Sequence, residues 1–208
     1  MYGKDIKVSI LNDLILFLYD QDAIKIGDFT LSSGKKSKFY LDLRILQSYP
    51  IYFRKSISLL KEYAIHYIGL DNFDCVCSIP TSGTVFGSSL AYEIFKPHIY
   101  VRKSIKQYGT QKTYEGSLIS NSNILFVDDV MTTGNSLITS VELLKDKSVV
   151  KDALVFVDRG QGTEFITESH GIKMHKIISM DEILNILIQN NRIGEEDFHD
   201  LKNELKKT

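Results

Sequence analysis

Apolar residues along this chain follow two different periods. In some segments they recur every three or four positions, which favours amphipathic helices, and in others they form short runs rich in Val, Ile and Phe, which favour buried strands. Helices are predicted for residues 6–18, 50–68, 85–95, 137–144, 164–169, 180–189 and 195–206. Strands are predicted for residues 73–79, 99–101, 123–129, 151–159 and 173–177. Because the two kinds of segment alternate, we predict an α/β fold in which helices flank a mostly parallel central sheet.

Residues 23–44 break this alternation. Two strand-like runs, Phe29–Leu31 and Ser37–Arg44, flank a turn of Ser, Gly and Lys residues at 32–36, which predicts a β-hairpin. On this pattern alone, the segment is equally compatible with a plain surface hairpin that carries solvated lysines.

The central strand leads into the most distinctive polar string of the chain. Its apolar run is followed by Asp128 and Asp129, and then by a Thr-Thr-Gly-Asn-Ser turn at 132–136 that begins a helix. Ligands of open α/β sheets bind at the carboxyl ends of strands, and the N–H groups at a helix N-terminus bind anions. The string therefore predicts a phosphate site with two carboxylates beside it, as a sugar phosphate requires. A paired Asp can also merely cap the following helix.

Two other predicted strands end in polar turns. Pro80–Gly83 follows the strand at 73–79, and the pair Asp158-Arg159 ends the strand at 151–159. Because the carboxyl ends of parallel strands share an edge, we expect the three turns to converge on one cleft. Each of these two turns is weak evidence alone, since every parallel sheet needs such turns and Asp-Arg can be a local ion pair.

The segment from Arg102 to Gly116 has no helical or strand period. It carries basic residues, two glycines and few apolar positions. A long loop of this kind inside a compact domain is usually functional or disordered, and a solvated basic loop is the default interpretation when it stands alone.

Composition narrows the class of protein. With 208 residues and 43% hydrophobic content we expect a single domain, and the net charge of −1 argues against a nucleic-acid or anionic membrane partner. No signal-like or membrane-spanning run is found, so we expect a cytoplasmic protein. Cys75 and Cys77 alternate along a predicted strand, so we expect them on opposite faces as reduced packing residues. The five histidines lack metal-ligand spacing.

Three strings together resemble one enzyme family. The string from Asp128 to Ser136 resembles the motif that binds phosphoribosyl pyrophosphate (PRPP) in type I phosphoribosyltransferases. Within that group, Phe29–Ser37 with the following aromatic residue and Asp-Leu-Arg resembles the amino-terminal signature of orotate phosphoribosyltransferases, and 102–116 resembles their mobile catalytic loop. The resemblance covers about residues 24–187. It implies the type I phosphoribosyltransferase fold over residues 1–208, with residues 1–48 forming a small hood over the base.

The resemblance also implies an activity and a set of site residues. The reaction is the transfer of ribose 5-phosphate from PRPP to orotate, giving orotidine 5'-monophosphate and pyrophosphate in pyrimidine synthesis, with Mg²⁺ held mainly by PRPP and water near the two acids. The implied catalytic residues are Lys103, Lys106, Asp128 and Asp129. The implied PRPP-binding residues are Thr81, Ser82, Gly83, Arg102, Lys103, Lys106, Tyr108, Asp128, Asp129, Val130, Met131, Thr132, Thr133, Gly134, Asn135 and Ser136. The implied orotate-binding residues are Tyr40, Thr132 and Arg159.

A homodimer that shares its active sites is implied as well, because the catalytic loop of this family reaches into the partner's site. Two departures from the family pattern stand out: Ser32 occupies a position that is lysine in many bacterial members, leaving Lys35 or Lys36 to supply the charge, and Tyr108 replaces a frequent histidine.

Two alternative functions are considered. One is a transferase for a purine base, which would lack the hairpin signature, and the other is a PRPP-sensing regulator, which would lack Lys103 and Lys106. We expect no fused decarboxylase domain.

Overall fold

The structure is a computed structural model that describes residues 4–30, 36–102 and 113–206. The chain divides into two compact units, one formed by residues 57–177 and the other by residues 1–56 together with 178–208. The second unit therefore includes carboxyl-terminal residues in addition to the amino-terminal segment predicted to form the hood. Within the described ranges, no helix is long and apolar enough to cross a membrane.

A six-stranded sheet forms the centre of the larger unit, in the order β5-β4-β3-β6-β7-β8. Strands β4, β3, β6 and β7 run parallel to one another, whereas β5 is antiparallel to β4. The predicted mostly parallel sheet is thus confirmed. Its strands are β3 (Cys75–Ser78), β4 (His98–Val101), β5 (Tyr114–Glu115), β6 (Ser122–Met131), β7 (Ser148–Asp158) and β8 (Lys173–Ser179), of which the last extends two residues into the other unit.

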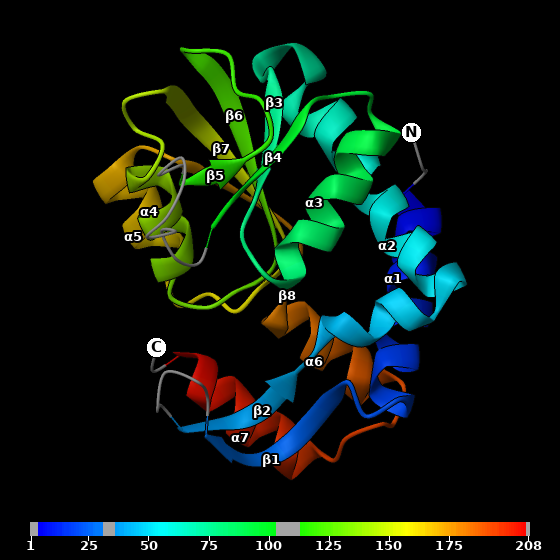
Figure 1. The fold of residues 1–208 in the computed structure, drawn as a ribbon. Helices are drawn as coiled ribbons and strands as arrows, with labels where there is room; N and C mark the ends of the chain where they lie inside the picture. The colour runs from blue at the N-terminus through cyan, green and yellow to red at the C-terminus, as the bar shows by residue number, and fades with distance from the viewer. Residues whose placement is uncertain (1–3, 31–35, 103–112, 207–208) are drawn as a thin grey trace. The chain divides into compact units, whose positions relative to one another are not determined.

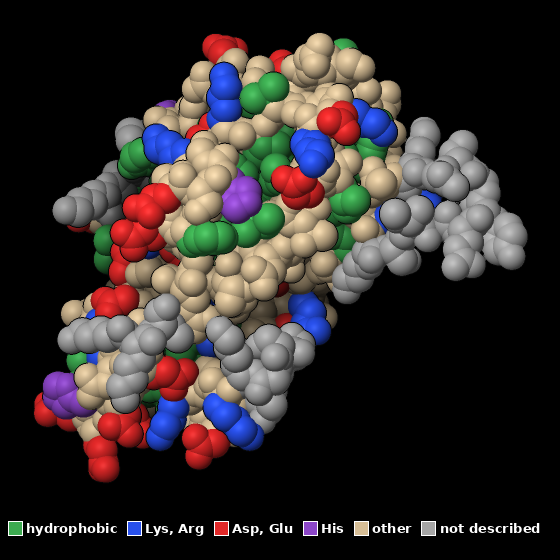
Figure 2. Space-filling view, turned by 90° about the vertical axis from the view of Figure 1, so that its left-hand side faces the viewer, with side chains coloured by type: hydrophobic (Ala, Val, Ile, Leu, Met, Phe, Trp, Pro, Cys, Tyr) green, Lys and Arg blue, Asp and Glu red, His purple; other side chains and the backbone are tan. Residues whose placement is uncertain are grey.

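Helices cover both faces of this sheet (Figure 1). Helix α3 (Ser82–Glu93) lies on one face, where the ring of Phe86 contacts that of Phe156 in β7. Helices α4 (Asn135–Glu142) and α5 (Thr163–His170) lie on the other face. The core under α4 and α5 takes alternate residues from each strand, as the strand period requires: Cys75, Cys77, Ile99, Val101, Ile124, Phe126, Ala153 and Val155. On the outer side of these two helices, hydrophobic side chains gather between charged ones (Figure 2).

The expected orientation of the two cysteines is wrong. Cys75 and Cys77 belong to the same core cluster, because residues two positions apart on a strand point to the same face. Both are free and buried, in agreement with their predicted role in packing. Burial raises the pKa of the Cys75 thiol to about 11, which keeps it protonated at neutral pH.

The order of the strands creates a switch point next to the central strand. The chain runs from β3 to β4 on one side, and then returns to place β6 on the other side of β3, with β7 beyond it. Ser78 at the end of β3 pairs in register with Val127 in β6. The turns that follow β3 and β6 therefore leave the sheet side by side and in opposite directions, which is where open α/β sheets bind ligands.

The second unit joins the amino-terminal and carboxyl-terminal segments of the chain. Its two-stranded antiparallel sheet packs with helices around an apolar core that includes Leu14, Leu18, Phe39, Leu184 and Leu201. Its elements are α1 (Lys4–Asp20), β1 (Ile24–Thr30), β2 (Lys36–Leu41), the 3-10 helix η1 (Leu43–Ser48), α6 (Met180–Gln189) and α7 (Glu195–Lys206). Helix α2 (Pro50–Tyr63) and the π-turn after it (Ala64–Ile68) lead from this unit into the larger one.

The predicted hairpin is present, but its second strand ends earlier than expected. Strand β2 stops at Leu41, and residues 43–48 form a 3-10 helix. The cause is Asp42, whose carboxylate accepts a hydrogen bond from the backbone N–H of Arg44 at 3.0 Å and so caps this helix. A second difference lies at the end of the basic segment, where residues 114–115 form the short strand β5.

Candidate active site

The strand, turn and helix predicted around Asp128 are confirmed, although the strand runs two residues beyond the two acids that were predicted to end it. The strand continues to Met131, and the turn ends at Gly134, whose φ of 76° is left-handed and suits glycine. Gly134 is also the N-cap of α4, and α4 has no side-chain cap. Its first backbone N–H groups are therefore available to an anion.

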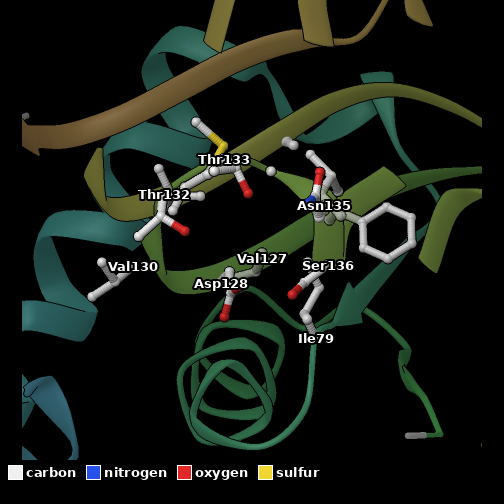
Figure 3. A pocket seen from close by; sticks show the side chains of 14 residues that line it. Ile79, Val127, Asp128, Val130, Thr132, Thr133, Asn135 and Ser136 are labelled. Carbon is white, nitrogen blue, oxygen red and sulfur yellow. The ribbon is translucent and has the colours of Figure 1, made fainter. Parts of the chain in front are cut away.

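A pocket opens at this turn, with about 400 Å³ of empty space when its mouth is included. The Asp128 side chain points downward from the strand in Figure 3, with Thr132 on one side and Ser136 on the other. The lining includes every residue of the predicted PRPP motif except Asp129, namely Asp128, Val130, Met131, Thr132, Thr133, Gly134, Asn135 and Ser136. Met131 is 4% exposed and belongs to the hydrophobic core of the larger unit.

Asp128 is the electrostatic centre of the site. Burial of its carboxyl group, together with the neighbouring charge of Asp129, raises the pKa of Asp128 well above its usual value. The backbone N–H of Asp129 donates a hydrogen bond to Asp128 Oδ1 at 2.9 Å, which partly offsets this effect. A carboxylate in these surroundings is stabilised by any ligand that brings hydroxyl donors or positive charge to it.

A second helix N-terminus meets Asp128 from below. Helix α3 also lacks a side-chain cap, and the Ser82 hydroxyl in its first turn is buried without a hydrogen-bond partner among the described residues. Gly83 packs so closely that a Cβ atom there would lie 2.4 Å from Asp128 Oδ1 and 3.1 Å from Asp128 Cα. The structure thus brings the predicted turn at Thr81, Ser82 and Gly83 into contact with the central motif.

The end of β3 is held in place beneath this turn. Ser78 Oγ lies 2.5 Å from His98 Nε2 in β4, and Gly87 of α3 leaves the space that this pair occupies. Burial lowers the pKa of His98, so its ring is neutral at physiological pH.

The third predicted turn packs directly on the central motif. The backbone N–H of Arg159 donates to the carbonyl oxygen of Met131 at 3.0 Å, and the Arg159 side chain is buried at the same edge of the sheet. Asp158 does not face the pocket. Its carboxylate accepts hydrogen bonds from the Gly160 N–H at 2.7 Å and the Thr163 hydroxyl at 2.8 Å, and it pairs with Lys176. Asp158 therefore shapes the turn that carries Arg159.

Gly162 is a site residue that the sequence did not reveal. A Cβ atom at this position would lie 2.3 Å from the carbonyl oxygen of Thr133 and 2.5 Å from its carbonyl carbon. Glycine is thus required because the backbone of the turn at 132–136 approaches it. The only available signal was the glycine spacing after Asp158-Arg159, whose meaning depends on a contact that local patterns do not report.

The basic segment is anchored at both ends. The backbone N–H of Arg102 donates to the carbonyl oxygen of Thr113 at 2.8 Å, and the Arg102 guanidinium forms an ion pair with Glu115. Its Nη1 atom is buried without a hydrogen-bond partner among the described residues. Three predicted site residues, Lys103, Lys106 and Tyr108, lie outside the described residues.

Tyr40 lies in β2 of the other unit and is half-buried. Its hydroxyl donates to Asp42 Oδ2 at 3.2 Å and accepts from Arg44 Nη2 at 3.0 Å, while the Arg44 guanidinium also binds both carboxylate oxygens of Asp42. These bonds to Arg44 lower the pKa of Asp42. Of the lysines considered for the charge missing at Ser32, Lys36 begins β2, and Lys35, like Ser32 itself, lies outside the described residues.

Comparison with known proteins agrees with this geometry. The family model of the phosphoribosyl transferase domain matches residues 49–184. The chain is 42% identical over 172 residues to the orotate phosphoribosyltransferase of Cenarchaeum symbiosum, covering 82% of this chain and 86% of the relative. It is 36% identical over 200 residues to that of Staphylothermus marinus, covering 96% of each chain.

Among solved structures, the crystal structure of orotate phosphoribosyltransferase from Aeropyrum pernix superposes with a TM-score of 0.72 at 32% identity. The match covers 84% of this chain and 98% of that one. The chain belongs to the phosphoribosyltransferase family and, within it, to the orotate phosphoribosyltransferases.

Proposed function

We propose that this chain transfers the ribose 5-phosphate group of PRPP to N1 of orotate, with inversion at C1, to give orotidine 5'-monophosphate and pyrophosphate in pyrimidine biosynthesis. The observation that carries the proposal is the pair of uncapped helix N-termini, of α3 and α4, that meet at the half-buried Asp128. PRPP carries a phosphate at one end of its ribose and a diphosphate at the other. Two anion seats with carboxylates between them match that arrangement of charge.

The turn before α4 suits the 5-phosphate of PRPP. The α4 N-terminus offers its first backbone N–H groups, and the hydroxyls of Thr132, Thr133 and Ser136 add further donors. Hydrogen bonds from several donors to an ionised phosphate are stronger than those between neutral groups. In this proposal the turn fixes one end of the ribose, so that C1 is presented to the base.

Asp128 and Asp129 suit the two ribose hydroxyls, since a carboxylate accepts hydrogen bonds from both. They also fit a nearby magnesium ion, because the cation would offset the unfavourable burial of the Asp128 charge. Among residues 4–30, 36–102 and 113–206, no group of three or more His, Cys, Asp or Glu side chains could hold a metal ion. We therefore assign most ligands of Mg²⁺ to PRPP and water. When bound, the ion neutralises the negative charge of the diphosphate.

The N-terminus of α3 suits that diphosphate. Thr81, Ser82 and Gly83 supply backbone donors, and the buried Ser82 hydroxyl, which has no hydrogen-bond partner within the described part of the chain, can donate to an oxyanion. Further positive charge comes, in this proposal, from Arg102, Lys103 and Lys106, with Tyr108 as an additional contact. Lys103 and Lys106 stabilise the leaving group as the glycosidic bond breaks.

Orotate is assigned to Arg159, Thr132 and Tyr40. The planar guanidinium of Arg159 matches the carboxylate or a carbonyl edge of orotate, and the backbone bond from Arg159 to Met131 supports a position beside the ribose. The face of Tyr40 suits a flat pyrimidine ring. We further propose a cytoplasmic homodimer with shared active sites, as the family resemblance implies.

Turnover with a panel of bases tests the proposed function. We expect the purified chain, given PRPP and Mg²⁺, to consume orotate, followed by the loss of its ultraviolet absorbance. Adenine, hypoxanthine and uracil should not be consumed at a comparable rate. Turnover of one of these bases in the absence of orotate turnover would overturn the substrate assignment.

A further inference from the structure

The carboxyl-terminal helix α7 lies against the hairpin that carries Tyr40 (Figure 1). A two-stranded sheet is marginally stable alone, and both of its strands are edge strands, so N–H groups that lack a partner across the ladder need acceptors elsewhere. Helix α7 packs on β2 and so supports the hairpin, and Leu201 of α7 and Phe39 of β2 are both buried. One residue of α7 also provides an acceptor for a backbone N–H group of the hairpin.

That residue is Glu204. Both of its carboxylate oxygens accept from the backbone N–H of Lys38, at 3.1 and 3.0 Å, and Oε1 also lies 3.2 Å from the Ser37 hydroxyl. Such bonds to a charged acceptor are stronger than those between neutral groups. The contact spans 166 residues of sequence and fixes the middle of β2.

The ladder between β1 and β2 explains why Lys38 needs this acceptor. Ile26 pairs with Phe39 and Phe29 pairs with Ser37, so the register shifts between them and Lys38 has no single partner in β1. Two residues of β1 face one residue of β2 at this β-bulge, which disrupts the ladder locally. Glu204 supplies, from another element, the acceptor for the Lys38 N–H at this irregular point of the ladder.

The position of Glu204 on its helix argues against a role in the stability of the helix itself. It lies in the last turn of α7, where the helix dipole disfavours a negative charge, whereas Glu195, Glu196 and Asp197 occupy the favourable first turn. An acid in the last turn costs helix stability unless another contact offsets it. The bonds to β2 are that contact.

Tyr40 follows Lys38 by two residues on the same strand. The Tyr40 hydroxyl forms hydrogen bonds with Asp42 and Arg44, and the Lys38 N–H is bound by Glu204. Hydrogen bonds therefore hold the segment 38–44 at both of its ends. We propose that Glu204 is a positioning residue of the base site, which sets the place of Tyr40 by holding the backbone of β2. The inference rests on the proposed function in one respect, the assignment of Tyr40 to orotate.

Steady-state kinetics of Glu204→Ala and Glu204→Gln test this role. We expect Glu204→Ala to raise KM for orotate about tenfold while KM for PRPP stays within about twofold of the wild type, since one charge-assisted contact is lost. Glu204→Gln keeps an acceptor for Lys38 and should show a smaller rise. Glu196→Ala, which removes an exposed acid from the first turn of the same helix, is the matched control and should behave as wild type.

Hydrogen exchange provides a readout that does not depend on catalysis. The Lys38 amide should exchange faster in both Glu204 variants than in the Glu196→Ala control. An unchanged KM for orotate in Glu204→Ala, or equal rises in both KM values, would overturn the inference even if the wild type converts orotate. Failure of the wild type to convert orotate would instead overturn the proposed function, and this inference with it.

Discussion

Replacing Gly162 with alanine should impair PRPP use through a single steric contact. The new Cβ atom would lie 2.3 Å from the carbonyl oxygen of Thr133, and the φ of Gly162 is −147°, which is not the left-handed conformation that favours glycine. The atoms it meets are backbone atoms of Thr133 in the proposed phosphate turn (residues 132–136), which no rotamer change can move aside. Either the turn that carries Arg159 or the turn at 132–136 must shift.

The size of the effect follows from the cost of overpacking. Inserting one methyl group into a closely packed site costs about 1–3 kcal/mol. If the shift falls on the phosphate turn, kcat/KM for PRPP should fall about 5- to 150-fold. Initial rates measured at varied PRPP and saturating orotate give this ratio, and urea unfolding gives the accompanying loss of stability.

Two other glycines serve as controls. Gly160 lies in the same turn with φ of 80° and has open space around its Cβ position, so Gly160→Ala should cost about 1–2 kcal/mol of stability through backbone strain and leave kcat/KM for PRPP nearly unchanged. Gly194 has neither a clash nor a left-handed φ, so Gly194→Ala should be neutral. If Gly162→Ala retained the wild-type kcat/KM for PRPP, the claimed coupling between the two turns would be refuted.

Three further predictions concern charge. Asp128→Asn should weaken PRPP use. Because the pKa of Asp128 is raised in the folded state, the stability of the wild type falls as pH rises through that pKa. Thermal unfolding of the variant at varied pH should not show this fall in stability. Lys106→Ala should reduce kcat far more than it weakens PRPP binding, and equal losses in rate and binding assays would make it only a binding charge. Asp152→Asn should cost about 1–3 kcal/mol in urea unfolding by weakening the 2.7 Å contact with buried His175, with unchanged kinetics.

Much of this fold could be predicted because its elements are set by local patterns. The helices at 180–189 and 195–206 have the predicted bounds, and the strand, turn and helix around Asp128 follow from one contiguous string. Local capping explains the error at the end of β2, where Asp42 diverts the chain into a 3-10 helix. The error over Cys75 and Cys77 was one of strand geometry, since side chains two residues apart share a face.

The contacts that could not be predicted join residues distant in sequence. Gly162, in the turn after β7, contacts Thr133, in the turn after β6. Glu204 binds Lys38, which lies 166 residues earlier in the sequence. Periodicity reports which face of an element is buried, but it does not report which element covers that face. These two contacts arise from the tertiary arrangement, and both bear on how the predicted site residues are held.

The most direct test of the account is the stoichiometry of the overall reaction. Orotate consumed and pyrophosphate released should be measured in the same sample, with PRPP and Mg²⁺ in excess. The account predicts one pyrophosphate for each orotate consumed and orotidine 5'-monophosphate as the product. Pyrophosphate release that does not depend on orotate, or no loss of orotate, would contradict it.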